Sequence, residues 1–283
     1  MNKLYAFLMV FGFCVLKPTV AQNVNYTIIA DKPGLGDICN VYFSPNIMLD
    51  FPFYTRYLDE FIPIDGMTLG YGFRSSVILK QKLQVDVNYW KGLWPARSRL
   101  FEFGGDLIVR QSTKMKELPI VLSQTEKQHM GRSVIESKYI NVPGTQLNFM
   151  GLRGGLHYHR SVFVDSRLDG ITDSYGIYGG ISLGIIRNLQ IRLQDKRVRE
   201  HSVFYKYYFD VILAYNNHTY FNGVVAGGSP IGFRIGRDMN NPMSGFFAMA
   251  TNVEIGYRPG LNGFYMGMAI TPVNVRRKME ALN

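Results

Sequence analysis

The sequence predicts an all-β chain that folds as an antiparallel, up-and-down transmembrane β-barrel of about ten strands, within a range of eight to twelve. The clearest observation is period-two alternation in residues 203–215, where one face is apolar and the other carries Lys206 and Asp210. Such a strand needs two different surroundings, and a membrane barrel with a polar interior provides both. After residue 21 no apolar run is long enough for a membrane-spanning helix, so any crossing must be made by strands.

The first 21 residues have the features of an export signal. Lys3 provides a positive start, residues 4–16 form an apolar core, and Thr19-Val20-Ala21 offers a cleavage site. Removal of residues 1–21 would leave Cys39 as the only cysteine. A mature chain of this kind has neither an internal disulfide nor a cysteine cluster for zinc.

Residues 22–64 are the least periodic part of the chain. Proline, glycine and aromatic residues interrupt the pattern, as in Asp31-Lys32-Pro33-Gly34. We expect an irregular N-terminal segment that packs on or inside the barrel, with short strands near residues 26–30 and 47–50.

Residues 65–275 have the regular alternation expected of barrel strands, joined as hairpins in a meander. The alternating stretches are residues 67–74, 83–90, 101–110, 148–159, 175–185, 189–194, 203–215, 220–225, 231–235, 247–257 and 264–270. We expect a tight turn at Arg187-Asn188, between two of these stretches.

Two segments depart from this regularity. Residues 112–144 are a long polar insertion, in which residues 120–122 and 134–135 would prolong the flanking strands as a protruding hairpin. Residues 276–283 form a polar C-terminal tail.

Charged side chains gather on the polar faces of the predicted strands, where a barrel would enclose them. The predicted lumen-facing network consists of Asp86, Glu102, Asp106, Arg110, Arg153, His157, Lys206, Asp210, Arg234 and Glu254. Opposite charges can pair there and avoid hydrocarbon. A polar channel or solute site is one interpretation; a structural network that fills a narrow lumen is the one we favour.

The opposite faces of the same strands are apolar and aromatic. The residues predicted to face lipid are Tyr205, Tyr207, Phe209, Val211, Leu213, Val253, Ile255 and Tyr257. An apolar row of this kind is suited to contact with acyl chains.

No motif in the chain predicts catalysis, a metal or a cofactor. His157 and His159 have a spacing that can chelate a metal, but a pair of lumen or rim histidines is the better interpretation. The glycine-rich residues 151–155 and 176–180 lack the helix and the Gly-Lys-Ser/Thr of a phosphate loop. There is no Gly-x-Ser-x-Gly elbow, so we expect that the protein is not an enzyme.

The formal net charge is +10, which raises the question of an anionic partner. Lysine and arginine alternate with aromatic residues along strands and do not cluster on a helix, so we expect no nucleic-acid binding. The expected partners are outer-membrane lipid, lipopolysaccharide phosphates and other envelope proteins.

Gly256-Tyr257-Arg258-Pro259-Gly260 and the glycine-rich segment 176–182, together with a signal ending in Val-Ala-Gln, carry a family resemblance. Over about residues 65–275 the chain resembles outer-membrane β-barrel proteins of Bacteroidota-type bacteria. The resemblance implies a porin, a structural barrel, or an accessory subunit of machinery for secretion, barrel assembly or uptake.

We therefore expect a barrel in the cell outer membrane, exported after signal removal, that is a structural or accessory subunit of an envelope complex. The first alternative is a small general diffusion porin. The second is an exported soluble β-barrel that binds an apolar ligand, which would need its apolar faces turned inward.

Overall fold

The structure is a computed structural model, and every structural statement below refers to the residues that it describes. They are residues 17–20, 24–31, 44–52, 54–57, 60–63, 68–79, 82–94, 98–129, 132–164, 169–194, 198–220, 229–241, 248–260 and 263–273. The chain forms two compact units. The barrel unit comprises Lys32–Lys114, Gln146–Arg187 and Ser202–Asn283; the extension unit comprises Met1–Asp31, Met115–Thr145 and Asn188–His201.

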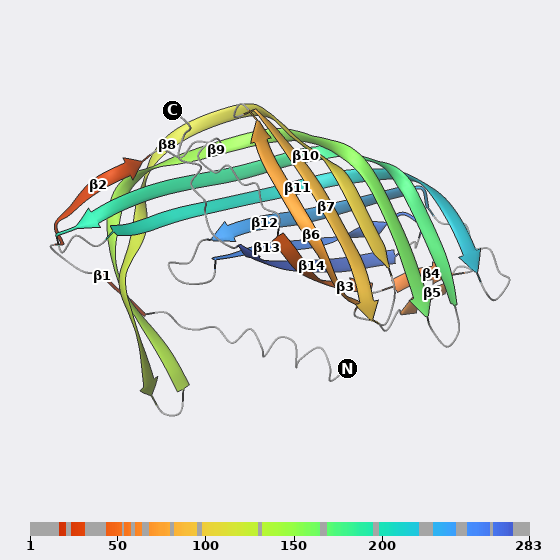
Figure 1. The fold of residues 1–283 in the computed structure, drawn as a ribbon, viewed down its shortest axis with the longest axis horizontal. Coiled ribbons are helices and arrows are strands. Elements are labelled where there is room, and N and C mark those ends of the chain that lie inside the picture. Colours follow the sequence, from red (N-terminus) through yellow and green to blue (C-terminus); the bar gives the residue numbers. More distant parts are fainter. Residues whose placement is uncertain are drawn as a thin grey trace. The chain divides into compact units, whose positions relative to one another are not determined.

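The described secondary structure consists of strands (Figure 1). They are β1 (Lys17–Val20), β2 (Tyr26–Asp31), β3 (Ser44–Pro52), β4 (Tyr54–Tyr57), β5 (Glu60–Pro63), β6 (Thr68–Leu79), β7 (Leu83–Trp94), β8 (Arg99–His129), β9 (Arg132–Val164), β10 (Asp169–Leu193), β11 (Val198–Tyr220), β12 (Ile231–Asn241), β13 (Ala248–Arg258) and β14 (Gly263–Val273).

Ten of these strands form a closed ring in the barrel unit. Their order is β3, β6, β7, β8, β9, β10, β11, β12, β13 and β14, and β14 pairs with β3. The paired ring strands run antiparallel, and the ring follows chain order, with β4 and β5 inserted between β3 and β6 as a separate two-stranded sheet. The predicted fold class, an antiparallel up-and-down β-barrel of about ten strands, is confirmed.

The N-terminal segment differs from the prediction at β3. Residues 44–52 are not irregular, because they pair with β14 on one side and with β6 on the other and so complete the ring. The strand expected near residues 47–50 is the centre of β3. Its short alternation between Pro45 and Pro52 is a weak sequence signal, and pairing on both sides stabilises it as a strand.

The other expected short strand, at residues 26–30, lies in β2, which pairs with the end of β10. Of the predicted signal, residues 17–20 form β1, which runs parallel to residues 136–139 of β9. The rest of that signal and the tail at residues 276–283 lie outside the described residues.

The tight turn predicted at Arg187-Asn188 is wrong, because β10 runs without interruption to Leu193. Along β10 the antiparallel partner is β9 as far as Arg187 and β2 from Leu189 onward. The polar pair Arg187-Asn188 therefore marks the place where β10 changes its partner from β9 to β2, and the chain does not reverse there. The strand predicted at residues 220–225 lies outside the described residues beyond Tyr220.

Within the predicted insertion 112–144, residues 112–129 continue β8 and residues 132–144 belong to β9, strands of 31 and 33 residues. The extension unit has an apolar core of its own, formed by Leu118, Ile120, Ile140, Val142, Leu189, Ile191 and Leu193. Because Leu118, Val142, Leu189 and Ile191 are fully buried, this core stabilises the extended strands.

Among the described residues, no helix is both long enough and apolar enough to span a membrane.

Candidate functional site: a charged network inside the barrel

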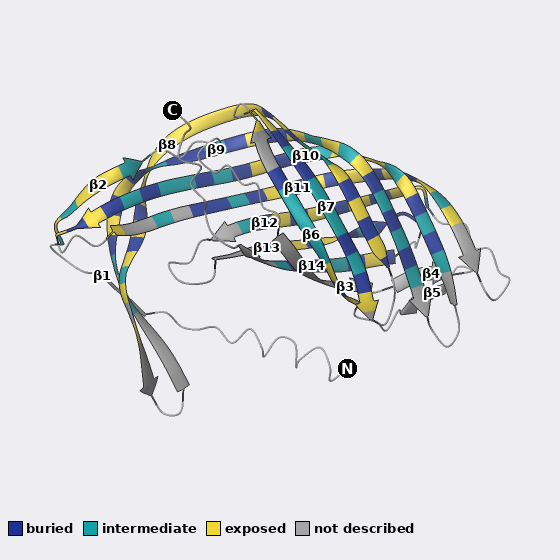
Figure 2. Cartoon of the chain, viewed as in Figure 1, coloured by how far each residue is buried: buried dark blue, intermediate teal, exposed yellow. Residues whose placement is uncertain are grey.

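The two faces of each barrel strand have different surroundings, and burial alternates along the strands (Figure 2). On β11, Lys206 and Asp210 are fully buried, whereas Phe209 is 41% exposed and Leu213 is 50% exposed. The even-numbered residues of this strand therefore point into the barrel, and the odd-numbered ones point outward. This arrangement is the reverse of a soluble barrel with an apolar interior.

Asp210 lies at the centre of the interior and joins two arginines from different strands. The Arg153 Nε donates to Asp210 Oδ1 at 2.8 Å, and the Arg234 Nε donates to Asp210 Oδ2 at 2.8 Å. Arg153 comes from β9 and Arg234 from β12. The shared carboxylate offsets the repulsion between two buried guanidinium groups.

Lys206 is the second centre of the network, and its ammonium group faces carboxylates from β7, β8 and β12. The Lys206 Nζ lies 3.0 Å from Asp106 Oδ2 and 3.5 Å from both Asp86 Oδ2 and Asp238 Oδ2. A fully buried ammonium group is stable only when it is paired in this way.

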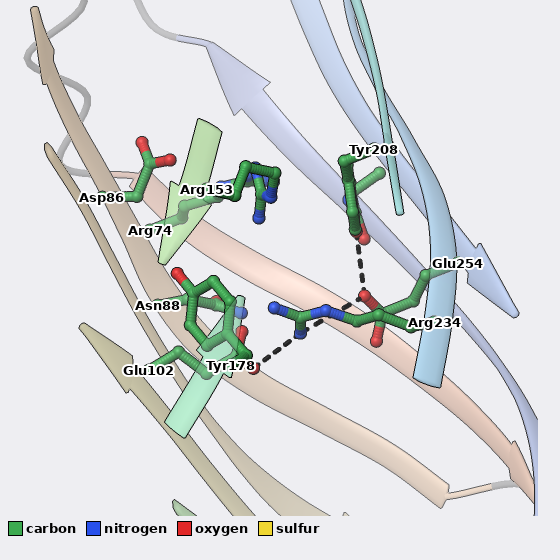
Figure 3. A pocket seen from close by; sticks show the side chains of 10 residues that line it. Arg74, Asp86, Asn88, Glu102, Arg153, Tyr178, Tyr208, Arg234 and Glu254 are labelled. Atoms are coloured by element: carbon green, nitrogen blue, oxygen red, sulfur yellow. Dashed lines mark hydrogen bonds and ion pairs between the residues drawn. The ribbon is translucent and has the colours of Figure 1, made fainter. Parts of the chain in front are cut away.

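Glu102 connects the arginine pair to a histidine. The Arg234 Nη1 lies 2.6 Å from Glu102 Oε1, and the His157 Nδ1 lies 2.9 Å from the same oxygen. On the other side of Arg234, Glu254 Oε2 is 3.8 Å from Nη1 and accepts a hydrogen bond from the Tyr208 hydroxyl at 2.9 Å (Figure 3).

Two tyrosine rings stack on the guanidinium groups. The Arg153 Cζ lies 4.3 Å from the ring centroid of Tyr208, and the Arg234 Cζ lies 4.9 Å from that of Tyr178. These distances are in the range of cation–π attraction. Inward-facing glycines leave room for the rings: a Cβ at Gly236 would collide with the Tyr208 ring, and one at Gly104 with the Tyr178 hydroxyl.

Nine of the ten residues predicted for the network lie in or beside this buried cluster, and Arg110 does not. Arg110 belongs to the inward-facing set of β8 by its position, but its side chain is exposed, as are all the residues from Val109 to Lys114. The alternation predicts on which face of the strand a side chain lies. It does not predict how far along the strand the enclosed barrel interior extends. Arg110 lies beyond that interior.

The network also contains residues that the sequence reasoning missed. Arg74 binds Asp238 through two hydrogen bonds of 2.8 and 2.9 Å, and Asn252 donates to Asp238 Oδ1 at 2.6 Å. The Tyr265 hydroxyl donates to Glu254 Oε1 at 3.1 Å. The missed signal was strand parity, since Arg74 shares the inward face of β6 and Asp238 that of β12.

The residues predicted to face lipid all lie on the outer faces of β11 and β13. Tyr207, Phe209, Val211, Leu213, Val253 and Ile255 are exposed, and Tyr205 and Tyr257 are half-buried.

Side chains leave little space at the level of the network. A cavity of about 30 Å³ remains among them, lined by Arg74, Asp86, Asn88, Glu102, Arg153, Tyr178, Tyr208, Arg234, Asn252 and Glu254. Such a volume holds about one or two water molecules. The next layer of the interior is apolar and consists of Ile108, Leu147, Phe149, Ile186 and Phe204.

The two histidines on β9 are buried, and their rings lie 6.3 Å apart. Glu102 contacts the Nδ1 of His157, and the Ser161 hydroxyl contacts the Nδ1 of His159 at 2.9 Å. Among the described residues, no group of three or more His, Cys, Asp or Glu side chains could hold a metal ion.

No protein-family model and no curated protein matches this chain. Among solved structures, one similar chain is OmpTdeltaL8, a loop L8 deletion mutant of OmpT, an outer membrane protein of Vibrio cholerae. It is 8% identical, the match covers 82% of this chain and 98% of that chain, and the TM-score is 0.17. The fold assignment therefore rests on the strand pairings, which make this chain a closed, up-and-down β-barrel with a charged interior.

Proposed function

We propose that this protein is a β-barrel of the cell outer membrane with a lumen closed by its own side chains, and that it is a structural or accessory subunit of an envelope complex. The proposal includes export after removal of residues 1–21 and assigns no catalytic role. The observation that carries it is the ion-paired network that fills the barrel interior.

The outer surface supports insertion into a membrane. Outward-facing apolar side chains run over residues 101–109 of β8, 150–156 of β9, 175–183 of β10 and 207–215 of β11. These runs approach or match the roughly 9–11 residues that a tilted strand needs to cross a bilayer. A soluble protein would expose an apolar band of this kind to water at a large cost in free energy.

A row of aromatic residues supports a membrane boundary at one end of this band. Phe73 of β6 pairs with Tyr89 of β7, and Tyr89 pairs with Phe101 of β8. On the next two strands Tyr158 pairs with Tyr175, and their ring centroids are 4.9 Å apart. Aromatic rows at this position are typical of the interface between hydrocarbon and water.

A closed lumen favours the subunit role over the porin alternative. Hydrated solutes need a continuous polar channel, whereas Lys206, Asp210 and Arg234 are at most 3% exposed. Lys206 is paired with Asp106, and Asp210 is paired with Arg234. An apolar layer follows the charged one along the interior. A filled interior of this kind is suited to stabilising the barrel, as in other small barrels.

Strand length supports a function outside the membrane. At 31 and 33 residues, β8 and β9 are about three times as long as a crossing requires. The surplus must lie in water or against another protein. The extension unit has a buried apolar core of its own, which would keep it folded while it contacts another protein.

Conductance in planar bilayers tests the closed lumen. We expect the purified protein to insert without producing a steady ionic conductance, because a lumen closed at the network, as proposed, offers ions no water-filled path. Flotation with vesicles and a heat-dependent shift in gel migration serve as controls for insertion. A stable, ohmic conductance of the native protein would replace this proposal with the porin alternative.

The subunit role is tested by the native size of the protein in gently solubilised membranes. We expect it to migrate in a defined assembly larger than the 32.3 kDa of the full 283-residue chain and to be crosslinked to the same proteins in repeated preparations. Migration as a lone barrel, together with a silent bilayer, would leave a purely structural barrel and overturn the subunit role.

A further inference from the structure

We propose that Lys91, Arg99 and Arg160, on the outer face of the barrel, form a binding site for the phosphate headgroup of an anionic membrane lipid. This inference rests on the proposed insertion of the barrel in a membrane. It concerns the lipid-facing surface and not the interior network.

The three cations lie on three consecutive strands. Lys91 of β7 pairs directly with Arg99 of β8. Gly104 of β8 and Gly155 of β9 are neighbours, since a Cβ added to either one would lie within 2.7 Å of the other's Cα. Antiparallel numbering from this pair places Arg99 opposite Arg160. Neighbouring strands are about 4.8 Å apart, so the three side chains leave the barrel side by side.

Their position relative to the aromatic row is the same on each strand. Lys91 follows Tyr89 by two residues, Arg99 precedes Phe101 by two, and Arg160 follows Tyr158 by two. A step of two residues stays on the same face of a strand, so the cations lie just beyond the aromatic row. Lipid phosphates are found at this depth, directly outside the interfacial aromatic residues.

The charges of this row have few anionic partners among the described residues. Among the described residues, no carboxylate lies within ion-pair distance of Lys91 or Arg99. Arg160 faces Asp173, whose Oδ1 is 3.9 Å from the arginine Nε and accepts a hydrogen bond from the Tyr158 hydroxyl. Like charges directly opposite on paired strands are destabilising, and a bound anion removes this repulsion.

The residue types suit a phosphate group. An arginine can donate two parallel hydrogen bonds to phosphate oxygens, and a lysine adds a point charge beside it. Acyl chains of the same lipid would then lie along the apolar outer face below, against Phe101, Phe103 and Leu107, which are 39–51% exposed.

The test compares the native protein with the double variant Lys91→Gln, Arg99→Gln in vesicles of phosphatidylcholine that contain increasing amounts of phosphatidylglycerol. Native mass spectrometry counts the phosphatidylglycerol molecules that each barrel retains. Each cation near a membrane surface contributes about 1 kcal/mol, so the double variant should bind this lipid about 30-fold more weakly.

The matched control is Lys138→Gln, Arg192→Gln, which removes two exposed cations of the extension unit. It should retain as much phosphatidylglycerol as the native protein. Unchanged retention by the Lys91, Arg99 variant would overturn the site. Displacement of the lipid by an equal concentration of inorganic phosphate would also overturn it, since the site would then bind free anions. Failure of the native protein to float with vesicles contradicts the proposed membrane insertion, whereas flotation without selectivity contradicts this inference alone.

Discussion

The fully buried Asp210 shows how a single side chain determines whether the interior charges are stable. Its two oxygens accept from Arg153 and Arg234, so each guanidinium group depends on the same carboxylate. Arg153 also lies 3.2 Å from Asp106 and Arg234 lies 2.6 Å from Glu102, so loss of the Asp210 charge would leave two guanidinium groups with fewer anions than they have in the native interior. In a medium of low polarity, such a loss costs more than the ion pair contributes when intact.

We predict that Asp210→Asn lowers the free energy of unfolding by about 3–5 kcal/mol, because two buried arginines lose their shared anion. Denaturant titration of the barrel in vesicles, followed by the gel-mobility shift of the folded form, measures the change. The control is Asp173→Asn on the outer surface, which should cost about 1 kcal/mol or less. Equal effects of the two substitutions would contradict an enclosed network.

A glycine on β12 illustrates the complementary requirement for space. The Tyr208 ring occupies the volume where a side chain of Gly236 would lie. We predict that Gly236→Val costs at least about 1–3 kcal/mol through overpacking, and that it weakens the cation–π contact of Tyr208 with Arg153. The double variant Gly236→Val, Tyr208→Ala should recover part of the loss, and a double-mutant cycle on unfolding free energies measures this coupling. Strictly additive losses would contradict the steric explanation.

The elements of this fold are strands with two chemically different faces. On β11 the inward face carries Lys206, Tyr208 and Asp210, and the outward face carries Phe209, Val211 and Leu213. Because the side-chain period is two residues, a register shift of one residue would exchange the faces and place charges in contact with lipid. The pattern therefore specifies the register of the strand as well as its orientation.

At this scale we predict a dependence on depth along the outer face of β11. Phe209→Lys should cost about 2–4 kcal/mol, because Phe209 lies well inside the apolar band, and Tyr215→Lys at its end should cost about 0–1 kcal/mol. The comparison uses unfolding free energies in vesicles of one lipid composition. If both lysines are tolerated equally, the outer face of β11 is not embedded in hydrocarbon.

The whole molecule combines a barrel unit and an extension unit, and each has its own interior. The barrel interior is charged in one layer and apolar in the next, whereas the buried core cluster of the extension unit is aliphatic. Two separate interiors should respond separately to substitution, because each set of contacts is contained within its own unit.

We predict that Ile191→Ala in the extension core lowers its local stability by about 2–5 kcal/mol, since Ile191 is fully buried among aliphatic side chains. Hydrogen exchange should become faster for backbone amides in residues 118–142, while the amides of β12 and β13 remain protected. The matched control is Ile255→Ala on the outer barrel surface, which should leave exchange in the extension unit unchanged. Loss of protection in β12 and β13 after Ile191→Ala would show that the two units unfold together.

Much of the fold follows from local alternation. The inward-facing residues of β8, β9 and β11 could be predicted from the sequence, because each strand is long and its two-residue alternation of apolar and polar side chains is clear. β3 could not be recognised as a ring strand, because its short stretch between prolines gains its pairing only from β6 and β14. The polar pair Arg187-Asn188 was misread as a turn for a related reason: which strand lies beside a residue is not a local property.

The candidate site was predictable in its membership and not in its connections. Residues on one face of a strand are known from numbering, but Asp106 and Lys206 are one hundred residues apart and meet only because the ring closes. The same limitation explains why Arg110 was wrongly placed in the network. Its position on the inward face of β8 follows from the alternation, but its exposure beyond the enclosed interior does not. Arg74 and Asp238 escaped notice because each lies near the end of a recognisable run.

The sequence by itself determined that the strands have an apolar and an ionised face, since period-two alternation assigns each side chain to a face without any long-range contact. Only the tertiary structure decided which of the ionised side chains meet and pair in the barrel interior. Ring closure sets the distance across the interior, and that distance allows side chains from facing strands to pair around a cavity of about 30 Å³.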